Sequence, residues 1–183
     1  MFLYMYILSV VSVICIAVDG NVTFHVGHSY GNGSFSAIHG RNGKSTRLCP
    51  PDWTLFGDSC YDVIKDKEEW TEANHICEIH WGYMAVIESS AENDFVKGLI
   101  KMEGVTEDVW IGANDLQEEG VFRWAATNQK LNFADWRAGE PNSIHNNENC
   151  VEIEYFLQDQ WNDDLCTKKQ YFICEKRPSG IVG

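Results

Sequence analysis

Residues 1–17 form the longest apolar run in the chain, and none of their side chains is charged. Such a run is typical of a secretory signal peptide, and small residues suit cleavage between residues 17 and 20. The run is slightly shorter than the roughly 20 residues of a membrane span, and no basic flank follows it, so a retained anchor is less favoured. We therefore expect residues 1–20 to be a signal peptide, with no membrane span after its removal.

Residues 21–47 differ in character, because glycine recurs among Ser, His and Asn and no hydrophobic period is visible. This composition predicts a flexible leader. It contains two glycosylation sequons, at Asn21 and Asn32, which suit a secreted glycoprotein. The leader has neither a heptad nor a Gly-X-Y repeat, so it predicts no trimer stalk.

Apolar residues recur at helical spacing in two later stretches. The first predicts a helix over residues 68–78. The second opens at Ser89, with Glu92 three residues later, which is the pattern of a capping box. The apolar positions are Trp70, Ala73 and Cys77 in the first helix and Phe95, Leu99 and Met102 in the second.

Shorter runs rich in β-branched and aromatic residues predict strands over residues 109–113, 122–124, 150–155 and 171–174. A hairpin is expected between Cys49 and Cys60. Residues 150–155 alternate apolar and acidic side chains, as a half-exposed strand should, so the acidic side chains are expected on the exposed face.

These elements predict one domain over residues 48–177, which is long enough for a single core, and a short tail over residues 178–183. Between residues 112 and 150 the chain is polar and rich in turns. Long irregular loops within a compact domain are usually functional, so we expect the binding chemistry there.

The cysteine count also describes this domain. Six of the seven cysteines follow Cys15, which lies in the apolar amino-terminal run. An even number in a secreted chain predicts three disulfides, although spacing alone allows fifteen connectivities. A zinc site is a poor alternative, because the cysteines do not form paired C-x-x-C clusters. The six are Cys49, Cys60, Cys77, Cys150, Cys166 and Cys174.

Five side chains in the region after residue 139 offer hard oxygen atoms and suit Ca²⁺, which binds about 6–8 oxygens. They come from two places that bracket Cys150 and Cys166, unlike the single loop of an EF-hand, so a loop and a strand end must converge. The alternative is an acidic, solvated loop whose Asn and Asp residues simply make turns. The five are Glu140, Asn142, Glu148, Asn162 and Asp163.

Three motifs resemble those of the C-type lectin domain family. Glu140-Pro141-Asn142 resembles its mannose-type signature, Trp161-Asn162-Asp163 its second signature, and Trp110-Ile111-Gly112 its core motif. The resemblance covers residues 48–176. It implies an α+β, C-type lectin-like fold with two helices, antiparallel sheets and a long calcium-binding loop region. It also implies the disulfides Cys49–Cys60, Cys77–Cys174 and Cys150–Cys166.

The resemblance assigns roles to the oxygen donors. All five would bind Ca²⁺, with Asp163 using its side chain and its backbone carbonyl. Glu140, Asn142, Glu148 and Asn162 would also hydrogen-bond sugar hydroxyls, and Ile144 would pack on the sugar ring. The order of Glu140 and Asn142 implies two equatorial vicinal hydroxyls, as in mannose, glucose, N-acetylglucosamine or fucose.

An auxiliary Ca²⁺ site is a further expectation from the resemblance. Asp115 and Glu119 resemble two of its ligands, and Glu148 would be shared. However, Ser143 and Asn149 stand where the family often has acidic ligands, and this removes charge from the auxiliary site. His145 lies beside the sugar-packing position, where its protonation would weaken binding at mildly acidic pH.

The net charge of −13 argues against nucleic acid or an anionic membrane as a partner. We expect a secreted, calcium-dependent lectin for glycans on cell or microbial surfaces, with innate immunity as one setting and homo-oligomers as a source of avidity. An interaction module with a structural calcium is the alternative. An enzyme is not expected, because the sequence has no Ser-His-Asp pattern in context, zinc motif or phosphate loop.

Overall fold

The computed structural model describes residues 12–18, 21–27, 49–156 and 159–178. These residues fall into two units that divide after residue 43. In the first unit, strands β1 (Ser12–Val18) and β2 (Asn21–Gly27) form an antiparallel pair.

Strand β2 differs from the irregular leader that we expected over residues 21–47. Its sequence alternates Val22, Phe24 and Val26 with polar residues. This short alternation is a signal for a strand, and the prediction of a leader did not take it into account. Cleavage between residues 17 and 20 would remove β1 and leave β2 without this partner. The signal peptide and the leader remain predictions, and the Asn32 sequon lies outside the described residues.

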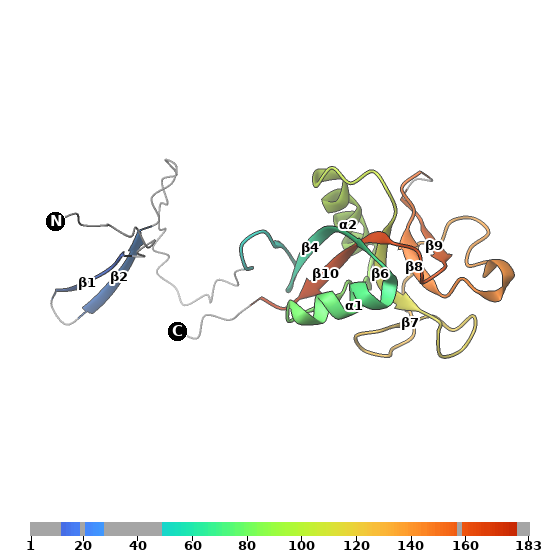
Figure 1. Cartoon of the computed structure of the whole chain (residues 1–183), viewed down its shortest axis with the longest axis horizontal. Coiled ribbons are helices and arrows are strands. Elements are labelled where there is room, and N and C mark those ends of the chain that lie inside the picture. The colour runs from blue at the N-terminus through green and yellow to red at the C-terminus, as the bar shows by residue number, and fades with distance from the viewer. Residues whose placement is uncertain (1–11, 19–20, 28–48, 157–158, 179–183) are drawn as a thin grey trace, which may run out of the picture. The chain divides into compact units, whose positions relative to one another are not determined.

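The second unit contains one mixed eight-stranded sheet with the order β3-β4-β10-β6-β8-β9, in which β5 also pairs with β10 and β7 with β6 (Figure 1). We expected antiparallel strands, and the pair β6–β10 is the exception, because Tyr171 lies beside Val109 in parallel register. The strands are β3 (Thr54–Phe56), β4 (Ser59–Glu68), β5 (Tyr83–Met84), β6 (Val109–Asn114), β7 (Arg123–Trp124), β8 (Cys150–Ile153), β9 (Trp161–Asp164) and β10 (Gln170–Lys176).

Two α-helices, α1 (Trp70–Ile79) and α2 (Ser90–Met102), confirm the helical spacing, and a short 3-10 turn, η1, covers Ile144–Asn146. The Ser89 side chain caps α2 by accepting from the N–H of Glu92. The Glu92 carboxylate reaches the N–H of Glu88 rather than that of Ser89. Met102 is 71% exposed. Its assignment to the apolar stripe was therefore wrong, because the buried stripe runs through Val96, Leu99 and Ile100.

The three disulfides pair as the resemblance implied: Cys49–Cys60, Cys77–Cys174 and Cys150–Cys166. Gly112 of the Trp-Ile-Gly motif lies in β6, against the backbone of Met84 and Ala85 at the end of β5. A Cβ atom there would lie 2.6 Å from the carbonyl oxygen of Met84, so only glycine fits. The core motif therefore has a packing reason for its glycine.

Strand β9 lies at the end of the strand order, and the loop before η1 covers its outer edge. The N–H of Trp161 donates to the Asp135 carbonyl at 2.8 Å, and the N–H of Arg137 donates to the Trp161 carbonyl at 2.9 Å. These bonds protect an otherwise unpaired edge and carry the Glu-Pro-Asn segment to the Trp-Asn-Asp strand. In Figure 1, β8 and β9 lie at the right-hand end with these loops.

Candidate calcium and sugar site

Asp163 holds the loop to β9. Its side chain is fully buried. Its Oδ1 accepts from the N–H of Asn142 at 3.0 Å and its Oδ2 from the N–H of Ser143 at 2.8 Å. Ser143, His145 and Asn146 have positive φ angles of 43°, 61° and 53°. Because such angles are strained for Ser and His, the Asp163 carboxylate helps to hold an unfavourable backbone in place.

Glu140 points inward from the loop, and its peptide bond to Pro141 is cis. Its side chain is only 2% exposed. One oxygen accepts from Nη2 of Arg137, whereas Oε2 is buried and has no hydrogen-bond partner among the described residues. Burial raises the pKa of the Glu140 carboxyl, the Arg137 guanidinium opposes this, and the Asp163 carboxylate raises the pKa again. The two carboxylates therefore interact.

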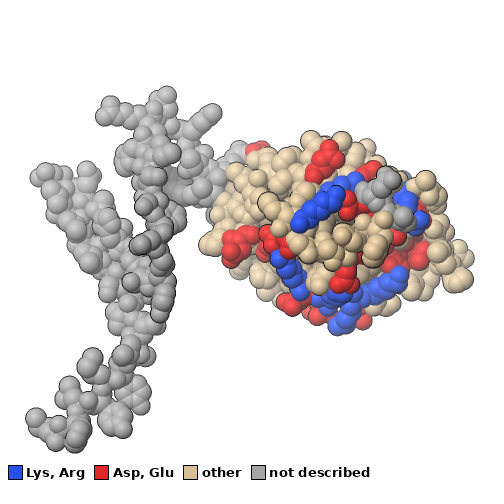
Figure 2. Space-filling model, turned by 90° about the horizontal axis from the view of Figure 1, so that it is seen from above, with Lys and Arg blue, Asp and Glu red and all other residues tan. Residues whose placement is uncertain are grey.

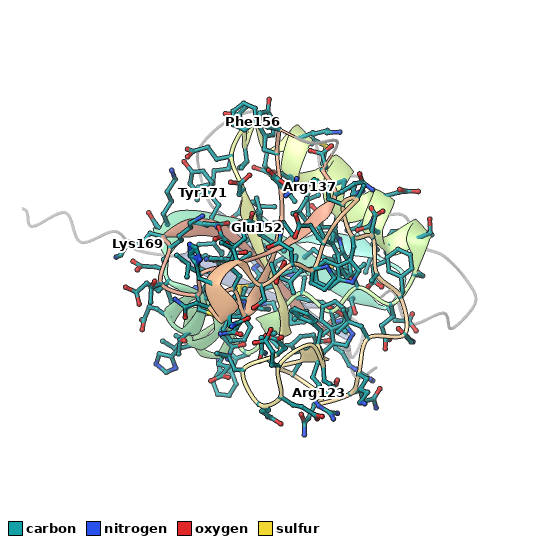
Figure 3. The ribbon with its side chains drawn as sticks, turned by 90° about the vertical axis from the view of Figure 1, so that its right-hand side faces the viewer. Arg123, Arg137, Glu152, Phe156, Lys169 and Tyr171 are labelled. Atoms are coloured by element: carbon teal, nitrogen blue, oxygen red, sulfur yellow. A yellow bond between two sulfur atoms is a disulfide. The ribbon has the colours of Figure 1, made fainter. Side chains whose placement is uncertain are left out.

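Asn162 is held on both sides of its amide. Its Oδ1 accepts from Nη2 of Arg137 at 3.2 Å, and its Nδ2 donates to Oε1 of Glu152 at 3.0 Å. Arg137 also lies 2.9 Å from Glu154, between its Nε and Oε2 atoms. The Arg137 guanidinium thus bridges Glu140 and Asn162 (Figure 3 labels Arg137 and Glu152). Arg137 was not among the residues predicted for the site, because its only signal in the sequence is a basic residue three positions before Glu140.

Glu148 lies on the same loop but bonds differently. Its Oε2 accepts from the N–H of Ile144 at 3.0 Å. Within the described chain no hydrogen bond joins the Glu148 side chain to the other proposed ligands. Ile144 is 53% exposed, as a residue that packs on a ligand would be. The structure therefore links Glu140, Asn142, Asn162 and Asp163 directly or through Arg137, and leaves Glu148 to one side.

Asp115, proposed for the auxiliary site, is buried. Its Oδ2 accepts from the N–H of Gly120 at 2.7 Å, and its Oδ1 has no partner in the part of the chain that the structure describes. Burial raises the pKa of the Asp115 carboxyl, and the Gly120 N–H partly offsets this. The charges of Glu119 and Asp163 raise the Asp115 pKa further, so both lie within electrostatic reach. The auxiliary site remains a prediction.

The donor set has the chemistry for Ca²⁺. Among the described residues, no three His, Cys, Asp or Glu side chains form a ready metal cluster. The donors that converge are the Glu140 and Asp163 carboxylates and the Asn142 and Asn162 amides, all hard oxygen ligands. A buried carboxylate oxygen without a partner is costly, and a cation at the unpartnered Oε2 of Glu140 would remove that cost. These residues therefore fit a calcium ion.

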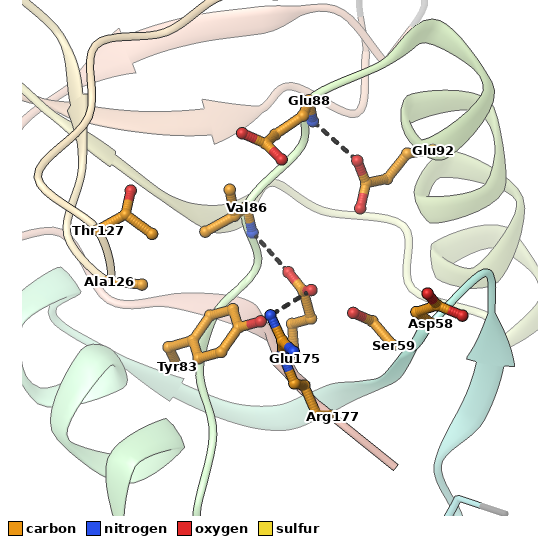
Figure 4. Close-up of a pocket in the computed structure, with 10 residues that line it drawn as sticks. All are labelled: Asp58, Ser59, Tyr83, Val86, Glu88, Glu92, Ala126, Thr127, Glu175 and Arg177. Carbon is orange, nitrogen blue, oxygen red and sulfur yellow. Dashed lines mark hydrogen bonds between the residues drawn. The ribbon is translucent and has the colours of Figure 1, made fainter. Parts of the chain in front are cut away.

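A pocket of about 430 Å³ lies apart from this site and is lined by other residues. It contains Glu175, which accepts from the Tyr83 hydroxyl and from the N–H of Val86, each at 3.0 Å (Figure 4). Glu92 in its wall bonds the N–H of Glu88. Because these carboxylates are occupied by the chain's own donors, we assign the pocket a structural role.

Charged side chains of both signs lie beside one another on the face in Figure 2. Ion pairs between exposed side chains of the domain include Lys65–Glu103 and Lys67–Glu107. No helix among the described residues has the length and apolar character to cross a membrane.

The family model described as Lectin C-type domain matches residues 66–176, so the chain belongs to the C-type lectin family. The chain is 33% identical over 134 residues to the galactose-specific lectin nattectin of Thalassophryne nattereri, which covers 73% of this chain and 83% of nattectin. The mouse scavenger receptor C-type lectin carbohydrate-recognition domain matches with a TM-score of 0.66 and 31% identity, over 72% of this chain and 100% of that domain.

A calcium-independent type II antifreeze protein has the same fold, with a TM-score of 0.65 and 26% identity over 72% of this chain and 96% of that protein. Members of the family are carbohydrate-binding or interaction modules rather than enzymes, in agreement with our expectation. Their differences in sugar and in metal mean that family membership alone fixes neither property for this chain.

Proposed function

We propose that this chain is a secreted lectin that binds sugars with equatorial vicinal hydroxyls in a calcium-dependent manner. The observation that carries the proposal is the meeting of Glu140, Asn142, Asn162 and Asp163 at the edge of β9, where Glu140 keeps a buried, unpartnered oxygen. The proposed ligands are glycans of the mannose, glucose, N-acetylglucosamine or fucose type on cell or microbial surfaces.

When bound, Ca²⁺ supplies coordination positions for two adjacent sugar hydroxyl oxygens. The chain's residues provide orientation. In this proposal the Glu140 carboxylate accepts a hydrogen bond from one hydroxyl and the Asn142 amide donates to its neighbour, while Glu148 and Asn162 bond the hydroxyls from the other side. Ile144, exposed next to the loop, packs on the ring. The residues that bind the metal would thereby also select sugars by the spacing of their hydroxyls.

The family rule that separates mannose from galactose concerns the residues on either side of Pro141. Glu140 and Asn142 have the mannose-type order, whereas Gln followed by Asp would favour galactose. Nattectin is named as galactose-specific, so its sugar is not transferred to this chain. The double variant Glu140→Gln/Asn142→Asp should lose mannose binding and keep its fold, because both changes preserve side-chain shape.

The second candidate is an interaction module that recognises protein. Two observations favour it: the fold occurs in a calcium-independent protein, and Arg137 already supplies a positive charge to Glu140 and Asn162. With Arg137 as an internal cation, the loop would keep its shape when metal is absent. In that case metal removal would leave partner binding unchanged.

Retention of the purified secreted chain on mannose and galactose resins, first with Ca²⁺ and then with EDTA, tests the proposal. We expect retention on mannose resin and release by EDTA. Equal retention of the double variant and wild type on mannose resin would contradict the residue assignment. A multivalent glycan array then tests the need for clustering, because a single monosaccharide site binds weakly.

A further inference from the structure

Glu152 is a buried carboxylate directly beside the proposed calcium site. The alternating pattern of residues 150–155 predicted that it would face solvent, and this was wrong, because Glu152 is 2% exposed. Strand β8 lies between β6 and β9, and Glu152 lies opposite Trp110 on one side and Asn162 on the other. Burying a carboxylate without hydrogen-bond partners costs free energy, so Glu152 needs groups that offset this cost.

Both Glu152 oxygens are occupied by amides. Oε1 accepts from Nδ2 of Asn162 at 3.0 Å, and Oε2 accepts from Nε2 of Gln170. Glu152 and Asn162 are cross-strand partners, so their side chains lie on one face of the sheet within contact range. Gln170 also reaches Oδ2 of Asp164 at 3.4 Å. Glu152 is thus the acceptor at the centre of a buried amide network.

This network determines which end of the Asn162 amide faces the site. An amide has a donor end and an acceptor end, and both Glu152 oxygens face amide nitrogens, so Glu152 takes the donor end of Asn162. Oδ1 of Asn162 is therefore turned toward Nη2 of Arg137, the atom that also donates to Glu140. A cation needs that oxygen, and the reversed amide would present N–H groups to it.

We propose that Glu152 is a positioning residue that holds Asn162 with its oxygen toward bound Ca²⁺. The inference rests on the proposed function, because it concerns the same site. Groups that orient metal ligands typically contribute about 10–100-fold to metal affinity. Glu152→Leu, which removes the acceptor, should lower Ca²⁺ affinity of the full secreted chain by about that factor in calorimetric titration. Glu152→Gln, which keeps one acceptor oxygen, should show a smaller loss.

Glu175→Leu is the matched control. Glu175 is also a buried carboxylate of the same sheet that accepts two hydrogen bonds, but from Tyr83 and Val86, far from the ligands in the strand order. Its replacement should lower the melting temperature in EDTA as Glu152→Leu does, while Ca²⁺ affinity stays at the wild-type value. A general loss of stability is thereby separated from a loss of ligand orientation.

The Asn162→Asp background provides a readout that a merely structural role would not move. A carboxylate offers oxygen at both ends and needs no orientation, so Glu152→Leu should cost little Ca²⁺ affinity there. Should the leucine variant fail to fold, Glu152→Gln is compared in the same two backgrounds, and its smaller loss of Ca²⁺ affinity should again appear only with Asn162.

The outcomes separate this inference from the proposed function. Failure of the wild type to bind Ca²⁺ would overturn the proposed function. If the wild type binds Ca²⁺, and both Glu152→Leu and Glu152→Gln bind it with the wild-type affinity, the positioning role alone is overturned. The positioning role would also be overturned if Glu175→Leu lost as much Ca²⁺ affinity as Glu152→Leu. The same holds if Glu152→Leu lost as much affinity in the Asn162→Asp background as in the wild-type background.

Discussion

In the half of the domain built from α1, α2, β4, β6 and β10, buried apolar side chains and the Cys77–Cys174 disulfide hold the elements together. At the β9 edge, Trp161 also packs in the core, but carboxylates hold the loop backbone there, as Asp163 does for Asn142 and Ser143. The buried carboxylate Glu175 in the first half is matched by the chain's own donors, whereas Glu140 at the edge keeps a free buried oxygen. A buried carboxylate whose oxygens are both hydrogen-bonded stabilises the fold, whereas a buried oxygen without a hydrogen bond can still bind a ligand.

The largest expected effect lies in the apolar half. Trp110 is fully buried, and its Nε1 donates to the Glu68 carbonyl at 3.2 Å. Trp110→Ala should lower the free energy of unfolding by about 3–5 kcal/mol, because it leaves a large cavity. Urea unfolding in Ca²⁺ and in EDTA should give the same loss. A loss seen only in EDTA would mean that the two halves are not independent.

The next effect lies at the edge. In Asp163→Asn, an amide N–H must face the N–H of either Asn142 or Ser143, so one partly buried donor loses its acceptor. We expect a cost of about 1–3 kcal/mol in urea unfolding and the loss of Ca²⁺ binding. Hydrogen exchange should rise over residues 140–149 and stay unchanged over α1. Unchanged exchange over residues 140–149 would show that Asp163 does not hold the loop.

A smaller effect is expected at the cap of α2. Ser89→Ala removes the side-chain acceptor for the N–H of Glu92 and should cost about 0.5–2 kcal/mol of stability. Calcium affinity should equal that of the wild type, because the cap belongs to the apolar half. Titration of Ca²⁺ into both proteins measures this, and a weakened affinity would show that α2 supports the site.

The smallest effect concerns pH. Burial raises the pKa of the Glu175 carboxyl above its ordinary value of 4.5, so the folded protein holds this proton more tightly than the unfolded chain. The resulting stabilisation is complete below pH 4.5 and is lost as the pH rises through the raised pKa. Relative to Glu175→Gln, the wild type should therefore lose stability as the pH rises toward neutral. If the difference in the free energy of unfolding between the wild type and Glu175→Gln did not change with pH, this expectation would be contradicted.

Local signals predicted much of the apolar half. Helical spacing identified α1 and α2, and Ser89 marked the start of α2 within one residue. The disulfide pairing followed from the family resemblance, since spacing allowed many connectivities. The parallel β6–β10 pair and the burial of Glu152 depend on which strands become neighbours, and local patterns do not contain that information.

The candidate site was predictable in its residue types and not in its connections. The five oxygen donors could be named from the sequence, and four of them are linked in the structure. Arg137 and Glu152 were missed because each acts through a partner distant in sequence, with Glu154 and Asn162 for Arg137 and Asn162 and Gln170 for Glu152. Such partners appear only once β8, β9 and the loop have come together.

The most direct test is a crystal structure of the chain grown with Ca²⁺ and methyl α-mannoside. We expect an ion about 2.3–2.6 Å from oxygens of the proposed ligands, with two adjacent sugar hydroxyls completing its shell. The amide of Asn162 should keep its Nδ2 on Glu152. A structure with no ion at this place, and with Arg137 still bridging Glu140 and Asn162 in saturating Ca²⁺, would contradict the calcium-dependent lectin.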